Sequence, residues 1–116
     1  MTWEYFKPEA HGLVHVGAVD WLAGEGCYEW SETTIMYHPE TQRFFWENDG
    51  GCSCDGPLDN VNTLDDLTSG TLHDLWTEVM SDLKNYEDSK NYEHIAADVV
   101  ETMSACLRVK DEGVQL

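Results

Sequence analysis

The sequence predicts an α+β fold in which a three-stranded antiparallel sheet, formed by the N-terminal half, is packed by two C-terminal helices and a short helical turn. Two observations predict this class. Apolar and β-branched residues alternate with a period of two as far as Glu47, and from Leu72 onward they recur at helical spacing. The length of 116 residues suits a single domain. We therefore assign residues 1–116 to a single acidic α+β domain.

Three strands are expected before the middle of the chain. The first begins at Leu13 and contains Gly17, a residue that in a strand marks a bulge or a neighbour crossing closely over it. The second spans Cys27 to Tyr37, which is rich in aromatic and β-branched residues, and the third spans Arg43 to Glu47. His38 to Gln42 has the composition of a turn between them. The three strands should therefore pair in sequential order as an antiparallel meander.

The C-terminal half should form two helices preceded by a short helical turn. Thr63–Asp66 and Thr71–Asp74 both have the Thr-x-x-Asp form of a helix start, and Ser69–Gly70 ends the first of these elements early. The second start opens a helix of about 13 residues. Asn85–Asp88 breaks it, and another helix begins near Ser89. The apolar residues at helical spacing, which we expect to face the core, are Leu72, Leu75, Trp76, Val79, Met80 and Leu83 in the first helix and Tyr92, Ile95, Ala96, Val99, Val100, Met103 and Leu107 in the second.

The charge of the chain restricts its partners. It carries 23 acidic and 6 basic residues, which give a formal net charge of -17. Such a surface repels nucleic-acid phosphates and anionic lipid headgroups, so we expect neither direct nucleic-acid binding nor membrane binding. No apolar run is long enough for a transmembrane helix, and the N-terminus lacks the features of a signal peptide. We expect a cytoplasmic protein whose partner has a basic surface. The alternative is that the charge only keeps the protein soluble.

A glycine-rich loop contains Cys52 and Cys54, one residue apart. Two thiolates at this spacing can bind Zn²⁺, which takes four ligands, and Cys27, His38 and Asp49 are candidates for the others. Strong zinc motifs contain a second cysteine pair, and this chain has none. The simpler interpretation is a tight turn with buried thiols. We therefore expect no metal or other cofactor, with Zn²⁺ as the alternative. We interpret all the cysteines as thiols because nothing indicates export. The alternative is a disulfide between Cys52 and Cys54, which would close a very small, strained and easily reduced ring.

No motif for catalysis stands out. The chain lacks a Gly-x-Ser-x-Gly nucleophile elbow, a P-loop, a dinucleotide-binding fingerprint and a His-Glu-x-x-His zinc motif. Adjacent carboxylates such as Asp65–Asp66 and Glu87–Asp88 are expected by chance among 23 acidic residues. We therefore predict that the protein is not an enzyme and has no catalytic residues. A small hydrolase is the alternative.

Asp74, Glu78 and Asp82 repeat every four residues along the first long helix. Four helical residues rise about 6 Å, close to two nucleotide steps of ~3.4 Å along a DNA strand, so a row of carboxylates at this spacing can imitate phosphates. These three residues are therefore candidates for partner binding in a DNA-mimic inhibitor of a DNA-binding enzyme. The alternative is an ordinary solvated helix face.

The hairpin and the cysteine loop carry a family resemblance. In order, they contain Tyr37-His38-Pro39-Glu40-Thr41, Arg43, Phe45, Asp49, Gly51-Cys52-Ser53-Cys54 and Pro57. This order resembles a family of small uncharacterised proteins encoded by actinobacteriophages, of the mycobacteriophage type. The similarity extends from Cys27 to Leu64, with Thr63–Leu67 as a weaker second match. The chain departs from the family pattern at Gln42, where a turn glycine is usual, and at Asp55, where proline often follows the second cysteine.

The resemblance implies a phage accessory protein made in the host bacterial cytoplasm, where such proteins commonly bind and divert a host protein. We therefore expect a non-catalytic protein that binds a host bacterial protein, with inhibition of that protein as one consequence. The alternatives are the DNA-mimic inhibitor and a small zinc-binding protein. The chain is a monomer or a homodimer, because its surplus of aromatic residues could cover a dimer interface whereas its net charge opposes self-association at low salt.

Overall fold

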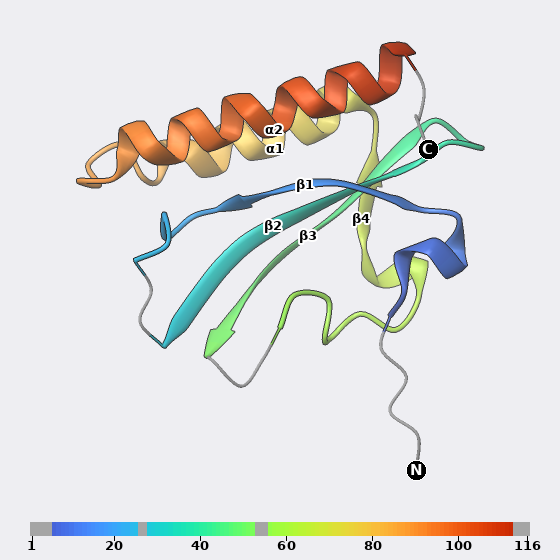
Figure 1. The fold of residues 1–116 in the computed structure, drawn as a ribbon, viewed down its shortest axis with the longest axis horizontal. Helices are drawn as coiled ribbons and strands as arrows, with labels where there is room; N and C mark the ends of the chain where they lie inside the picture. The colour runs from blue at the N-terminus through green and yellow to red at the C-terminus, as the bar shows by residue number, and fades with distance from the viewer. Residues whose placement is uncertain (1–5, 26–27, 53–55, 113–116) are drawn as a thin grey trace.

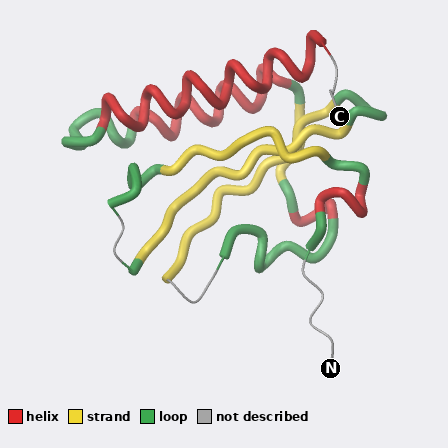
Figure 2. Tube along the Cα trace, viewed as in Figure 1, coloured by secondary structure: helices red, strands yellow, loops and turns green. Residues whose placement is uncertain are grey.

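A computed structural model of the protein describes residues 6–25, 28–52 and 56–112. These residues form an α+β fold with an antiparallel sheet, two α-helices and two short 3₁₀ helices, η1 and η2 (Figure 1, Figure 2). In chain order the elements are η1 (Pro8–His11), β1 (Val14–Asp20), β2 (Glu29–His38), β3 (Arg43–Cys52), η2 (Leu64–Asp66), β4 (Thr68–Gly70), α1 (Leu72–Lys84) and α2 (Tyr92–Glu112).

The sheet is the middle layer of the molecule. Its strands follow the order β1-β2-β3-β4, and every neighbouring pair is antiparallel. Both α-helices lie on one face of the sheet, as predicted, while η1 and the segment between β3 and β4 lie on the other face (Figure 1). Because side chains alternate between the two faces of a strand, β2 and β3 supply apolar residues to both sides.

Two cores hold these layers together. Each large apolar side chain that is fully buried contributes about 1.5–3 kcal/mol, so burial on both faces fixes the position of the sheet. The larger core lies between the sheet and the helices and contains Val19, Trp21, Ile35, Tyr37, Phe44, Trp46, Leu75, Val79, Leu83, Ile95, Val99, Met103 and Cys106. The smaller core lies on the opposite face and contains Leu13, Met36, Val61 and Leu67.

The predicted hairpin between β2 and β3 is confirmed. Tyr37 lies opposite Phe44, and His38 lies opposite Arg43 at the end of the ladder. Gln42 closes the turn with a left-handed backbone, φ 59°, and its N–H donates to the carbonyl of His38 at 2.8 Å. Glycine adopts this backbone conformation most easily. The turn thus has a backbone conformation that suits glycine, although glutamine occupies it.

The outer edge of β1 is closed by side chains from α2. The Thr102 hydroxyl donates to the carbonyl of Ala18 at 3.2 Å, and the backbone N–H of Asp20 donates to a carboxylate oxygen of Asp98 at 2.9 Å. The register of β1 shifts around Gly17, as predicted, and a Cβ placed there would lie 3.4 Å from Thr102 Cγ2. A strand edge satisfied in this way is a poor template for pairing with another chain.

Two predicted helix starts are confirmed, and the third is displaced, since α2 begins at Tyr92 and not near Ser89. Thr71 and Asp74 form the capping box of α1, in which the Asp74 N–H donates to Thr71 Oγ1 at 3.2 Å and the Thr71 N–H donates to Asp74 Oδ2 at 3.0 Å. The predicted length of α1 is confirmed at 13 residues. Thr63 and Asp66 form a second capping box at η2, which is the expected short helical turn. No helix among the described residues is both long enough and apolar enough to cross a membrane.

Two expectations for the sheet are wrong. It has four strands and not three, because Thr68–Gly70, interpreted as the end of a helical element, forms β4 and pairs with Phe44–Trp46. A strand of three residues is too short to show a period in the sequence. In addition, β3 continues through Gly50 and Gly51 to Cys52, since the ladder to β2 extends to Glu29. Glycines predicted a loop there, and pairing with an adjacent strand overrode that local preference.

Candidate functional site

Asp74 is the first of the three predicted partner-binding carboxylates, and the fold uses it as a helix cap. Its Oδ2 accepts the backbone N–H of Thr71 at 3.0 Å. The hydrogen bond from the backbone N–H of Thr71 lowers the pKa of Asp74, and the hydrogen bond with the Thr71 side chain lowers it further. A negative charge at a helix N-terminus is also stabilised by the helix dipole. The structure therefore gives Asp74 a structural role of its own, and the residue remains exposed.

Glu78 and Asp82 lie on the side of α1 that faces β3. A carboxylate oxygen of Glu78 accepts hydrogen bonds from the indole N–H of Trp46 and from Asn48 Nδ2, the latter at 3.0 Å. Burial raises the pKa of Asp82, and the charge of Glu78 raises it further. The structure brings these two residues together beside the sheet, whereas a solvated row along the helix would place them in open water.

Two candidate metal ligands, His38 and Asp49, form hydrogen bonds with residues of neighbouring turns and loops. His38 Nδ1 accepts the backbone N–H of Thr41 at 3.2 Å and lies 2.7 Å from Thr41 Oγ1, so the imidazole fastens the β2–β3 turn. Asp49 Oδ2 accepts the backbone N–H of Leu58 at 2.9 Å and holds the segment after β3 against the sheet. Among the residues that the structure describes, no group of three or more His, Cys, Asp or Glu side chains could hold a metal ion.

The cysteines differ from one another. Cys52 is disulfide-bonded, so the expectation that every cysteine is a thiol is wrong at this position. The other loop candidates, Cys54 and Cys27, lie outside the described residues. Cys106 is a thiol in the larger core, and burial raises its pKa to about 12. A thiol so rarely ionised at neutral pH is a poor nucleophile, and it serves as a small apolar side chain.

Four carboxylates lie near the start of β2, along β3 and in the last turn of α1, and we call Glu32, Glu47, Asp49 and Asp82 the acidic end. Glu47 follows Trp46, which faces the helices, so its side chain lies on the other face of the sheet from Asp82. Glu32 lies directly opposite Asp49 in the ladder, and both line a hollow of about 190 Å³ together with Asp82. Partial burial raises the pKa of Glu47, and the charges of Asp49 and Asp66 raise it further. Like charges directly opposite each other in a sheet are destabilising. The acidic end is therefore an arrangement that the fold alone does not favour.

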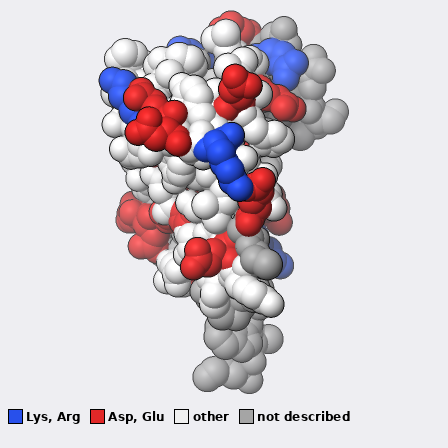
Figure 3. All heavy atoms as spheres, turned by 90° about the vertical axis from the view of Figure 1, so that its left-hand side faces the viewer, with Lys and Arg blue, Asp and Glu red and all other residues white. Residues whose placement is uncertain are grey.

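Few basic groups neutralise these charges. Among the described residues, the only salt bridge joins Lys90 Nζ to Glu25 Oε2 at 3.4 Å. Figure 3 looks at the end of the molecule where β2 begins, β3 ends and the turn between α1 and α2 lies. Asp and Glu form several groups on it, and Lys or Arg side chains lie between some of them. Unpaired carboxylates on one end of a molecule create a negative potential that attracts cationic groups.

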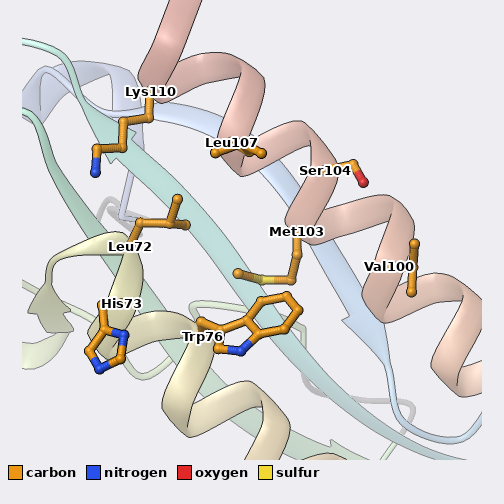
Figure 4. A pocket seen from close by; sticks show the side chains of 8 residues that line it. All are labelled: Leu72, His73, Trp76, Val100, Met103, Ser104, Leu107 and Lys110. Carbon is orange, nitrogen blue, oxygen red and sulfur yellow. The ribbon is translucent and has the colours of Figure 1, made fainter.

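A second surface lies on the outer side of the helical layer. The α1–α2 groove has a volume of about 460 Å³ and is open to solvent (Figure 4). Its sides carry large apolar residues that are well exposed: Trp76 is 45% exposed, Val100 63% and Leu107 51%. The residues that line it are Leu72, His73, Trp76, Val100, Met103, Ser104, Leu107 and Lys110. Contiguous exposed apolar residues of this kind mark interaction surfaces.

The exposure of the groove residues corrects the sequence analysis. Trp76, Val100 and Leu107 were expected on the faces that pack into the core, and the structure places them at the outer margins of those faces. The apolar stripe of each helix is wider than the single sheet surface can cover. The extra width of the stripe is the feature of the sequence that could have predicted an exposed apolar surface. A single buried stripe in α1 needs only residues such as Leu75, Val79 and Leu83.

Comparisons with known proteins place the chain in a family. Neither a curated protein nor a solved structure matches it. A family model described as "Domain of unknown function (DUF7574)" matches residues 2–111, which include every strand and almost all of α2. The chain therefore belongs to the DUF7574 family.

Proposed function

We propose that the chain is a phage-encoded accessory protein that acts in the host cytoplasm by binding, and thereby inhibiting, a host bacterial protein with a basic surface. No catalytic step is involved. The observation that carries this proposal is the acidic end, where Glu32, Asp49 and Asp82 line one hollow and Glu47 lies near Asp49, and none of the four forms a salt bridge with another described residue. The phage origin rests on the resemblance of the hairpin and the cysteine loop.

The electrostatics of the acidic end support a binding role. Glu47 and Asp82 both have raised pKa values, first from burial and then from neighbouring carboxylates. A cationic side chain of the partner brought close to either residue would relieve the repulsion there, so part of the binding free energy would come from repulsion already present in the free protein. The net charge of -17 would also speed the encounter with a basic partner.

Affinity capture from host lysate tests the proposal. The wild-type chain should capture a host protein, and the triple variant Glu32→Gln, Glu47→Gln, Asp82→Asn should bind it about tenfold or more weakly. A matched control removes the same number of charges from exposed positions elsewhere, Glu9→Gln, Glu40→Gln and Asp111→Asn, and should bind like the wild type. The proposal fails if no host protein is captured, or if the two triple variants lose binding equally.

The DNA-mimic alternative makes a different prediction. It needs Asp74, Glu78 and Asp82 to act as a row, and two of these carboxylates already accept hydrogen bonds within the fold. Under this alternative the captured protein is a DNA-binding enzyme, DNA competes for it, and Asp74→Asn, Glu78→Gln and Asp82→Asn together abolish binding. Capture of a protein that DNA does not displace favours the basic-surface partner instead.

A further inference from the structure

We propose that the α1–α2 groove is the contact surface between two copies of this chain, which pack α2 against α2 in antiparallel order. This inference goes beyond the proposed function and rests on different residues. It would produce a two-fold dimer that leaves the acidic end of each copy free. Three observations support it: the spacing of the exposed residues on α2, the charges beside them, and the composition of the groove.

The outward face of α2 has the spacing of a helix–helix seam. Ala97, Val100, Ser104 and Leu107 follow one another at intervals of three and four residues, which places them in one line along the helix. Ala97, Val100, Ser104 and Leu107 are all exposed, whereas Ile95 and Val99 on the other side of α2 are buried in the core. Small and apolar residues in such a line allow two helices to approach closely along it.

One pair of charges beside this line is complementary to itself. Glu101 and Arg108 are exposed and lie seven residues apart, so they share the flank of α2 that faces away from α1. In an antiparallel two-fold contact, each flank meets the same flank of the other helix. Glu101 of one copy would then lie beside Arg108 of the second copy, and the pair would form twice. A partner unrelated to this chain would have no reason to match this order of charges.

The groove itself is the place where two such acidic molecules would repel each other least. Its lining contains no Asp or Glu, and its charged or titratable members are Lys110 and His73. The same composition makes it unsuited to a basic partner. Trp76 projects from α1 toward Met103 of α2 (Figure 4), and contact with a second copy would cover the exposed part of its indole. Large aromatic residues in such positions commonly anchor interfaces.

Sedimentation of the full chain over a range of protein concentrations tests the dimer, at about 0.15 M and about 0.5 M salt so that general repulsion is screened in the second condition. Glu101→Arg or Arg108→Glu alone should raise the dissociation constant of the dimer about tenfold or more, because each places like charges opposite each other twice. The double variant restores both pairs with the order reversed, and it should return the dissociation constant to within about threefold of the wild type.

The control is Glu9→Arg, which makes the same change in net charge as Glu101→Arg on an exposed residue of η1, across the sheet from α2. It should dimerise like the wild type. Leu107→Lys should be monomeric with an unchanged circular-dichroism spectrum, since Leu107 lies outside the core. A wild-type chain that stays monomeric overturns the proposal, as does a double variant that fails to recover. If the wild type is monomeric and Leu107→Lys instead loses capture of a host protein, the groove holds that protein and the proposal is likewise overturned.

Discussion

Glu47 shows how single residues of the acidic end store unfavourable electrostatic energy. Burial raises the pKa of Glu47, and the charges of Asp49 and Asp66 raise it further. The folded chain therefore holds this proton more tightly than the unfolded chain does. As pH rises above the ordinary value of 4.5, the folded state must ionise a carboxyl group that its surroundings disfavour, so stability falls with rising pH through the raised pKa.

Glu47→Gln should accordingly stabilise the fold at neutral pH. Glutamine does not ionise, so the folded variant avoids the free-energy cost of a charged side chain at position 47. Its midpoint of urea unfolding at about pH 7 should therefore exceed that of the wild type. At about pH 4, where Glu47 is protonated in the folded wild-type chain, the two midpoints should converge. Glu40→Gln, in the exposed hairpin turn, should show neither effect. A Glu47→Gln variant that is less stable than the wild type at neutral pH would contradict this account.

At the scale of single residues the sequence predicts positions better than contacts. The spacing of Glu78 and Asp82 correctly places both carboxylates on one side of α1. Their local environment could not be predicted, because Trp46, which donates to Glu78, is 32 residues away in the chain. The prediction for Cys52 is wrong as well, because this residue is disulfide-bonded and not a thiol. The number and spacing of cysteines do not decide which of them pair.

The junction between β4 and α1 shows how two elements share one residue. Gly70 is buried at the end of β4, opposite Phe44, and it directly precedes the capping box of α1. A Cβ on Gly70 would lie 2.6 Å from Asp74 Oδ2 and 2.9 Å from Asp74 Cβ. The strand and the helix can therefore meet this closely only because residue 70 has no side chain.

Gly70→Ala should separate the strand from the helix and break the capping box. Overpacking together with loss of a cap should lower the free energy of unfolding by about 1–3 kcal/mol, measured by urea unfolding followed by circular dichroism. The matched control is Gly17→Ala in β1, where the new Cβ would lie 3.4 Å from Thr102 Cγ2, an ordinary contact. Equal losses in the two variants would show that glycine is needed for some reason other than the approach of Asp74.

At the scale of elements, the long regular segments are predictable and the short ones are not. The apolar period of α1 and its Thr71 cap fix both ends of that helix, and the structure agrees. In contrast, β4 exists only because β3 offers it a pairing edge at Phe44–Trp46. The continuation of β3 through Gly50 and Gly51 likewise depends on β2 beside it. Both elements are stabilised by tertiary pairing, and a single sequence shows no trace of that pairing.

At the scale of the whole molecule, the acidic end and the α1–α2 groove occupy different surfaces. The acidic end lies where β2 begins and where β3 and α1 end, whereas the α1–α2 groove is lined without any Asp or Glu. The sequence predicts the layering of helices on a sheet and the excess of negative charge. It could not predict this separation, because residues as distant as Glu32 and Asp82 meet only in the folded chain. A dimer through the groove would present two acidic ends to a basic partner.

The net charge of the whole molecule should make its stability depend on salt. With a charge of -17 and a single salt bridge among the described residues, repulsion within the folded chain exceeds attraction, and compaction intensifies it. Raising NaCl from about 0.02 M to about 0.5 M should therefore raise the melting temperature by about 5 °C or more. The melting temperature should be measured in the Leu107→Lys variant, so that dissociation of a dimer does not contribute.

In the same Leu107→Lys variant, the added substitutions Glu32→Gln, Glu47→Gln and Asp82→Asn should make the melting temperature respond less to salt, because fewer like charges remain to be screened. A melting temperature that falls with salt would mean that attractive ion pairs dominate the fold.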